Sequence, residues 1–240
     1  MRIVDSFGGT HQGRVRPINE DRFLLRPDEG VMLVADGMGG HSHGDIASSA
    51  IVSHVDAALL NGGARGGLGA VADAIRAANG AIIDIARAND GLTIGSTVAA
   101  LVLEDARFRV AWTGDSRVYL LRDGAVRPLT RDHTEADMLL RDGRITPEEA
   151  AGWPRAHVIA HAIGVVSEPH LETAEGEARA GDAFVACTDG LTAHVADEEI
   201  AILAAGATAE RLCKELVRLA LERGGTDNVS VVVGRVGVDL

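Results

Sequence analysis

Short strand-like segments joined by tight turns recur along this 240-residue chain, and they constrain its fold more than any other feature. Residues 21–26 and 31–35 flank the turn sequence Pro27-Asp28-Glu29-Gly30, which predicts a β-hairpin. Further apolar segments predict additional antiparallel strands, at residues 96–104, 107–113, 118–122, 183–188 and 228–236.

Three amphipathic segments predict helices between these strands, at residues 45–60, 68–85 and 207–223. In the first, Ala47, Ile51 and Val55 share one face. The Gly-rich stretch 61–67 is expected to connect two of the helices flexibly. Many antiparallel strands together with long helices predict an α+β fold, in which a central β-sandwich is flanked by helices.

Composition narrows the class of protein. The net charge is −12 and only seven residues are aromatic, whereas a nucleic-acid binder needs basic and stacking surfaces. No apolar run approaches the ~20 residues of a membrane span, and the N-terminus lacks the apolar core of a signal peptide. With only two cysteines, we expect a cytoplasmic protein without nucleic-acid or membrane partners.

The first hairpin brings two carboxylates together. If Arg26 lies opposite Val31, then Asp21 lies opposite Asp36. Directly opposed side chains are ~5 Å apart, and like charges there repel unless a cation or a proton intervenes. A register slip of one residue would instead separate the pair.

Three more aspartates fall at predicted strand ends. Asp115 lies in a turn between strands, Asp189 follows a strand, and Asp227 precedes one. Asp5 is left out because its neighbouring glycines suggest a bend. Oxygen ligands gathered at one rim of an antiparallel sandwich favour Mg²⁺ or Mn²⁺ over zinc. A glycine after Asp36 and after Asp189 allows the backbone to approach a metal closely.

An ordered set of motifs resembles the metal-dependent Ser/Thr protein phosphatases of the PPM type (protein phosphatase 2C), in particular compact bacterial members. The set runs in family order from about residue 5 to residue 236. Its motifs are Arg16-Pro17-Ile18-Asn19-Glu20-Asp21, Val34-Ala35-Asp36-Gly37-Met38-Gly39-Gly40-His41, Gly95-Ser96-Thr97, Gly114-Asp115-Ser116-Arg117, Leu129-Thr130-Arg131-Asp132-His133, Thr188-Asp189-Gly190 and Gly225-Thr226-Asp227-Asn228.

The resemblance implies helices on both faces of the sandwich (an αββα arrangement) and a centre of two Mn²⁺ or Mg²⁺ ions at one rim. It implies that Asp36 bridges both ions and that the Gly37 carbonyl binds the first. It also implies that Asp189 and Asp227 bind the second ion, and that Asp21 lies at a metal or directly behind its ligands.

Further roles follow from the same resemblance. Glu20 would orient a metal-bound water, Asp115 would hold a weaker third metal, and Arg16 would bind the substrate phosphate. Position 38 is Met, where certain eukaryotic members have a His proposed as the general acid. His41 and His43 are nearby candidates, so the acid remains unassigned.

Residues 133–170 interrupt the strand series. Thr134 and Asp137 suit a helix N-terminus, and Thr146 begins a capping box with Glu149. The segment is either a helical insertion beside the site or an ordinary crossover. The resemblance identifies it with the family's variable flap, within a single domain covering residues 1–240.

We therefore expect a monomeric enzyme that hydrolyses phosphoserine and phosphothreonine in proteins, opposing a bacterial Ser/Thr kinase. Two other functions stay open: a phosphoesterase acting on small molecules, and a catalytically silent binding module.

Overall fold

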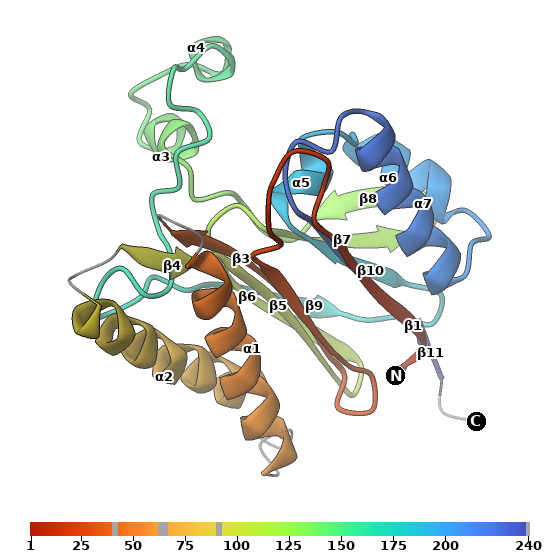
Figure 1. The fold of residues 1–240 in the computed structure, drawn as a ribbon. Helices are drawn as coiled ribbons and strands as arrows, with labels where there is room; N and C mark the ends of the chain where they lie inside the picture. Colours follow the sequence, from red (N-terminus) through yellow and green to blue (C-terminus); the bar gives the residue numbers. More distant parts are fainter. Residues whose placement is uncertain (40–42, 62–66, 90–92, 239–240) are drawn as a thin grey trace.

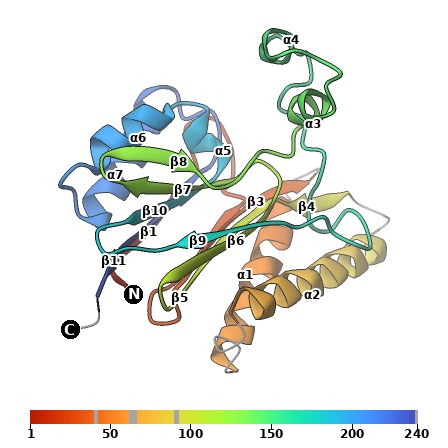
Figure 2. The same ribbon diagram turned by 180° about the vertical axis from the view of Figure 1, so that it is seen from behind.

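The computed structural model describes residues 1–39, 43–61, 67–89 and 93–238. Two antiparallel sheets pack face to face, and helices cover the outer face of each sheet (Figures 1 and 2). This arrangement confirms the predicted α+β sandwich with helices on both sides. Among the described residues, no helix is both long enough and apolar enough to cross a membrane.

The first sheet has the strand order β1-β11-β10-β7-β8. Its strands are β1 (Arg2–His11), β7 (Arg117–Arg122), β8 (Ala125–Pro128), β10 (Ala183–Cys187) and β11 (Val229–Gly237). The second sheet has the order β2-β3-β5-β6-β9, with β4 paired to β3. Its strands are β2 (Asp21–Arg26), β3 (Val31–Gly39), β4 (Ile94–Ser96), β5 (Val98–Glu104), β6 (Arg107–Thr113) and β9 (Glu172–Glu177).

The helices fall into three groups. Helices α1 (Gly44–Leu60) and α2 (Gly67–Ala88) cover the second sheet. Helices α5 (Asp189–Thr192), α6 (Asp197–Ala204) and α7 (Ala209–Glu222) cover the first. Helices α3 (Glu135–Arg141) and α4 (Pro147–Ala151) stand clear of both sheets (Figures 1 and 2).

Strand alternation creates three buried apolar layers. In β3, Leu33 packs against the α1–α2 side, whereas Met32 and Val34 pack between the two sheets. In β10, Phe184 faces the space between the sheets, whereas Val185 faces the α5–α7 side. Because both faces of each central strand are buried, these strands are apolar almost throughout.

The hairpin formed by β2 and β3 has the predicted register. Arg26 pairs with Val31, and Asp21 pairs with Asp36. The register slip considered above does not occur, because it would turn Leu24 and Leu33 away from their buried layers.

The bend expected around Asp5 is wrong. Asp5 lies in β1, which pairs with β11 from Arg2 to His11 with one irregularity, between Ile3 and Asp5. The nearby glycines provide space rather than a turn: a Cβ at Gly8 would lie 2.5 Å from the Phe23 ring. The Asp5 Oδ2 atom accepts a 2.8 Å hydrogen bond from the Ala209 backbone N–H, at the start of α7. Asp5 thus has a structural partner away from the rim.

The strand expected at residues 96–104 is divided in two at Thr97, between β4 and β5. Thr97 Oγ1 accepts a hydrogen bond from the Asp36 backbone N–H, and the Thr97 N–H donates to the Asp36 carbonyl. This break therefore fixes the backbone of Asp36.

Both helix starts expected between residues 133 and 170 are present. Thr134 Oγ1 accepts from the Asp137 N–H at 3.3 Å. Thr146 and Glu149 form the reciprocal capping box at the start of α4. The predicted flexible connection at 61–67 falls largely on residues 62–66, which lie outside the described residues, as does His41.

Candidate metal centre

The five predicted rim aspartates come from five different places in the chain and meet at one end of the sandwich. Asp21 begins β2, Asp36 lies on β3, and Asp115 lies in the turn between β6 and β7. Asp189 begins α5 directly after β10, and Asp227 precedes β11. The other four carboxylates all lie close enough to raise the pKa of Asp36 electrostatically. Convergence of the five predicted residues is therefore observed.

Several of these carboxylate oxygens are buried without a partner. Asp21 is fully buried; its Oδ2 accepts from the Thr188 hydroxyl at 2.8 Å, but its Oδ1 has no hydrogen-bond partner. Asp115 Oδ1 and Asp189 Oδ1 are likewise buried and unpartnered. Unpartnered buried anionic oxygens are costly. Three of them at one rim fit a hard divalent cation, which takes oxygen ligands.

Burial and mutual repulsion raise the pKa values of three of the rim aspartates. Burial, followed by repulsion from Asp189 and Asp227, raises the pKa of Asp21 to about 7. Burial, followed by Asp189 and Asp132, raises the pKa of Asp115 to about 7. Burial and the neighbouring carboxylates raise the pKa of Asp36 well above its usual range. A divalent cation would displace protons from these groups, because it favours the ionised carboxylate.

Close backbone approaches explain the two glycines that follow rim aspartates. A Cβ at Gly37 would lie 2.1 Å from the Gly44 carbonyl oxygen, at the start of α1. A Cβ at Gly190 would lie 1.9 Å from the Asn228 carbonyl oxygen. Any larger residue would push α1 or β11 away from the rim.

Arg16 lies at the same rim and remains accessible. Its Nη2 lies 2.5 Å from Asp227 Oδ2, yet the Arg16 side chain is 52% exposed. The hydrogen bond to Asp227 is the main cause of its raised pKa, and the charges of Asp36 and Asp189 act in the same direction. The planar guanidinium can also bind two phosphoryl oxygens.

Glu20 has a local partner that the sequence did not indicate. Its Oε1 accepts a 2.7 Å hydrogen bond from the Gly44 N–H, at the first residue of α1. A carboxylate at this end of a helix is favoured by the helix dipole. The Glu20 backbone oxygen also accepts from the Gly37 N–H and the Ser48 hydroxyl. Glu20 therefore joins α1 to both strands of the first hairpin.

Asn228 is a site-building residue that sequence reasoning missed. Its side-chain amide donates to the carbonyls of Gln12 and Ile18, and its Oδ1 accepts from the Glu20 N–H. These bonds hold the loop that carries Arg16 against the start of β11. The sequence analysis noted Asn228 only as the last residue of the motif Gly225-Thr226-Asp227-Asn228, without a role.

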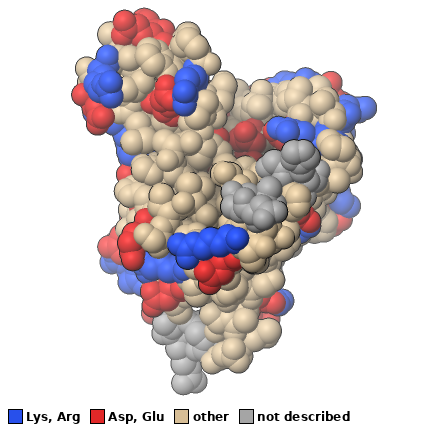
Figure 3. All heavy atoms as spheres, turned by 60° about the vertical axis from the view of Figure 1, so that its left-hand side comes forward, with Lys and Arg blue, Asp and Glu red and all other residues tan. Residues whose placement is uncertain are grey.

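Of the two histidines considered for the general acid, only His43 falls within the described residues. Met38 is on β3, paired with Gly95 on β4, and His43 precedes the first residue of α1. In the space-filling view, acidic atoms occupy a recess beside the projecting lobe of α3 and α4 (Figure 3).

A second polar group lies where the segment containing α3 and α4 joins the sheet. Within the described part of the chain, only one set of three or more His, Cys, Asp or Glu residues has all its candidate ligand atoms within 4.8 Å of one another. Its members are His133, His170 and Glu172. The Gly114 N–H donates to His133 Nδ1, so the proton of the neutral ring lies on Nε2, 3.3 Å from Glu172 Oε2. Arg141 also contacts both Glu172 oxygens, at 2.9 and 3.0 Å. Glu172 is therefore held by its ion pair with Arg141, whereas His133 Nε2 is buried and makes no hydrogen bond to a described residue.

Known proteins share this sequence and fold. The chain is 38% identical over 229 residues to the serine/threonine protein phosphatase PstP of Mycobacterium tuberculosis. This match covers 94% of the chain but only 43% of that relative, so the chain spans less than half of its length. The serine/threonine phosphatase stp of Listeria monocytogenes is 32% identical, with 93% and 92% of the two chains covered.

Solved structures and a family model agree with these relatives. The structure of the PstP catalytic domain in complex with two manganese ions superposes with a TM-score of 0.83 at 34% identity. It covers 99% of this chain and all of that one. The family model described as Protein phosphatase 2C matches residues 8–226. With this match over most of its length, the chain belongs to the protein phosphatase 2C family.

Proposed function

We propose that this protein hydrolyses phosphoserine and phosphothreonine in proteins and that it depends on Mn²⁺ or Mg²⁺. The observation that carries the proposal is the group of buried, unpartnered carboxylate oxygens at a rim that also presents a half-exposed arginine. The names of the relatives, and the manganese in one of their structures, support the same activity.

The proposed ligands are the residues that the rim brings together. Asp36, the Gly37 carbonyl, Asp189 and Asp227 would hold two ions. Glu20 and Asp21 would support them, and Asp115 would hold a third, weaker ion. When bound, the cations supply Lewis-acid activation of the attacking water.

The chain's own residues orient the substrate. Arg16 binds the phosphate and exchanges part of its contact with Asp227 for phosphoryl oxygens, since its side chain is already directed to the rim. Thr97 fixes the Asp36 backbone, and the Thr188 hydroxyl fixes one oxygen of Asp21. The carboxylates are thereby held in place before substrate arrives, which lowers the reorganisation needed for reaction.

The natural setting is part of the proposal. We infer that the protein acts as a monomer in the cytoplasm on phosphorylated proteins, and that it opposes a Ser/Thr kinase. The projecting α3–α4 segment, here called the flap (residues 133–170), would contact the protein substrate.

The test measures phosphate release from a phosphothreonine peptide and from p-nitrophenyl phosphate, after chelation and after addition of Mn²⁺. We expect activity on both substrates only with the metal, and its loss in Asp36→Asn. Asp56→Asn is a matched control, because Asp56 lies on α1 and pairs with Arg26 of β2 rather than with a rim residue. Activity that survives thorough chelation would exclude the metal mechanism. Activity on the small ester alone would indicate a small-molecule phosphoesterase, and no activity at all a binding module.

A further inference from the structure

The turn that carries Asp115 is enclosed by the segment leading into the flap. Apart from the contacts of Asp132 with Arg117, five hydrogen bonds join this lead-in segment (residues 129–133) to the two strands that flank the turn and to the turn itself. The Leu129 N–H donates to the Val118 carbonyl at 2.7 Å, and the His133 N–H donates to the Gly114 carbonyl at 2.9 Å. In the other three, Trp112 Nε1 donates to the Arg131 carbonyl, the Val118 N–H donates to Thr130 Oγ1, and the Gly114 N–H donates to His133 Nδ1.

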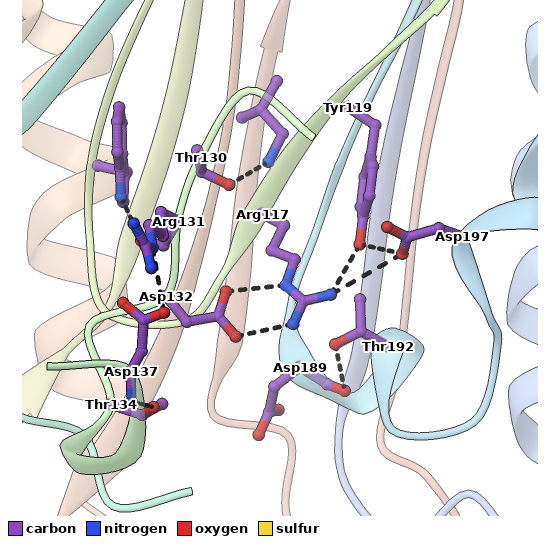
Figure 4. Close-up of polar contacts among 12 residues, drawn as sticks. Arg117, Tyr119, Thr130, Arg131, Asp132, Thr134, Asp137, Asp189, Thr192 and Asp197 are labelled. Carbon is purple, nitrogen blue, oxygen red and sulfur yellow. Dashed lines mark hydrogen bonds and ion pairs between the residues drawn. The ribbon is translucent and has the colours of Figure 1, made fainter. Parts of the chain in front are cut away.

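Arg117 binds the lead-in segment through a two-pronged contact with Asp132. Its Nε and Nη2 atoms each donate a 2.8 Å hydrogen bond to a different oxygen of Asp132, in the lead-in segment (Figure 4). Its Nη1 donates to the Tyr119 hydroxyl at 3.0 Å, and that hydroxyl donates to Asp197 at the start of α6. The guanidinium thus connects β7 to the flap side and to the helical layer.

The same pair acts on Asp115 through its charges. Asp132 is close enough to Asp115 to repel its carboxylate, whereas Arg117 attracts it. Arg117 therefore offsets a carboxylate that would otherwise repel the one in the turn. Its planar fork is suited to this task, because it fixes both oxygens of Asp132 in one orientation.

We propose that Arg117 is a positioning residue for Asp115: by fixing Asp132, it holds the lead-in segment around the turn and so orients Asp115 toward its cation. This inference rests on the proposed function for the identity of that cation. It predicts that Arg117 acts through Asp115, although its own guanidinium is directed to Asp132 and Tyr119.

The chain offers a matched control on the same strand. Arg122, at the other end of β7, makes the same fork to Asp182, through Nε at 2.7 Å and Nη2 at 2.6 Å. Asp182 is 2% exposed, compared with 23% for Asp132. Arg122→Met therefore removes an equivalent and more buried ion pair far from the rim, and it measures the purely structural effect.

The experiment compares Arg117→Met and Arg122→Met, each alone and combined with Asp115→Asn. Weak Mn²⁺ binding is measured without substrate, by the electron paramagnetic resonance signal of free Mn²⁺. We expect Arg117→Met to weaken the Asp115-dependent Mn²⁺ site about tenfold or more, as removal of a residue behind a metal ligand commonly does. Arg122→Met should leave that affinity unchanged even if it lowers the melting temperature more.

Kinetics on the phosphopeptide give the second readout. If Arg117 acts through Asp115, the double variant Arg117→Met/Asp115→Asn should have the kcat of Asp115→Asn alone, whereas the effects of Arg122→Met and Asp115→Asn should multiply. Asp132→Asn disrupts the same two-pronged contact but removes the carboxylate that repels Asp115, so it should weaken the Mn²⁺ site only if the fixed position of the lead-in segment matters, as proposed; it also serves if Arg117→Met does not fold.

Two outcomes would overturn the inference: equal Mn²⁺ affinities in the two arginine variants, or multiplicative kinetic effects of Arg117→Met and Asp115→Asn. Absence of any Asp115-dependent Mn²⁺ site in the unaltered protein would overturn it as well. Failure of the proposed function looks different, because the unaltered protein would then release no phosphate although the Mn²⁺ titration could still be read.

Discussion

Single residues at the rim carry separable parts of the proposed reaction. Asp36 is enclosed by four other carboxylates, so Asp36→Asn should remove the ligand that organises the ions. Arg16 is half exposed and contacts only one rim carboxylate, so Arg16→Ala should mainly weaken phosphate binding. We expect kcat to fall at least about 100-fold in the first variant and KM to rise about tenfold in the second. Steady-state kinetics on a phosphopeptide would measure both, and the reverse pattern would show that the two roles are assigned wrongly.

Asp115 lies in a turn, apart from the paired hairpin residues Asp21 and Asp36, so we expect it to hold a cation with fewer protein ligands and more weakly. Asp115→Asn should therefore leave the two tighter ions bound while removing the weak one. Activity should fall more on phosphopeptides than on p-nitrophenyl phosphate, because a serine alkoxide needs protonation far more than a nitrophenolate does. Crystals soaked in Mn²⁺ and both assays would check this. Loss of all ions, or equal damage with both substrates, would contradict it.

At the scale of elements, Glu172 at the start of β9 fastens the flap to the sheet. It pairs with Arg141 of α3 and faces His133 at the beginning of the flap. Glu172→Gln should loosen this attachment, so KM for a phosphoprotein should rise several-fold while kcat on p-nitrophenyl phosphate stays unchanged. Glu175→Gln is the control, because Glu175 lies on the same strand but pairs with Arg107 and Arg109. Equal KM values in the two variants would exclude a role of the Glu172 contacts in substrate binding.

Elements with strong local signals were predictable from the sequence. The turn and apolar pattern of residues 21–36 gave the strand register, and with it the opposition of Asp21 and Asp36. Strand β9 was missed because its sequence, Glu-Thr-Ala-Glu-Gly-Glu, carries little apolar content. Strand β1 was obscured by glycines whose purpose, such as space for Phe23 above Gly8, is visible only in the packed structure.

The candidate site also has a part that was predictable from the sequence and a part that was not. Positions of the rim aspartates follow from strand ends, which are local features of the sequence. The contacts that hold the rim together join residues far apart: Asn228 binds Glu20 across 208 positions, and Thr188 binds Asp21 across 167. No local pattern encodes such pairs, so sequence reasoning could name the carboxylates but not their supports.

At the scale of the whole molecule, the rim gathers mutually repelling carboxylates in a protein that already has a net charge of −12. Asp21 and Asp115 have pKa values of about 7 in the folded protein, compared with ~3.9 for an aspartate in an unfolded chain. The folded state therefore holds protons that the unfolded state has released, and stability must fall as pH rises from about 4 to 7. Ionisation of these carboxylates in the folded protein therefore lowers the free energy of unfolding.

Cations should reverse this loss, because they bind the ionised carboxylates of the folded state only. We expect the melting temperature in a chelator to be lower at pH 8 than at pH 5, and Mn²⁺ to raise it more at pH 8 than at pH 5. Asp115→Asn should flatten the pH dependence in the chelator, which separates the rim from the general effect of net charge. Added monovalent salt gives a second separation, since it screens exposed charges much more than buried ones. A metal-free protein that is equally stable at both pH values, or a stabilisation by Mn²⁺ that is independent of pH, would show that protons and cations do not compete for these carboxylates.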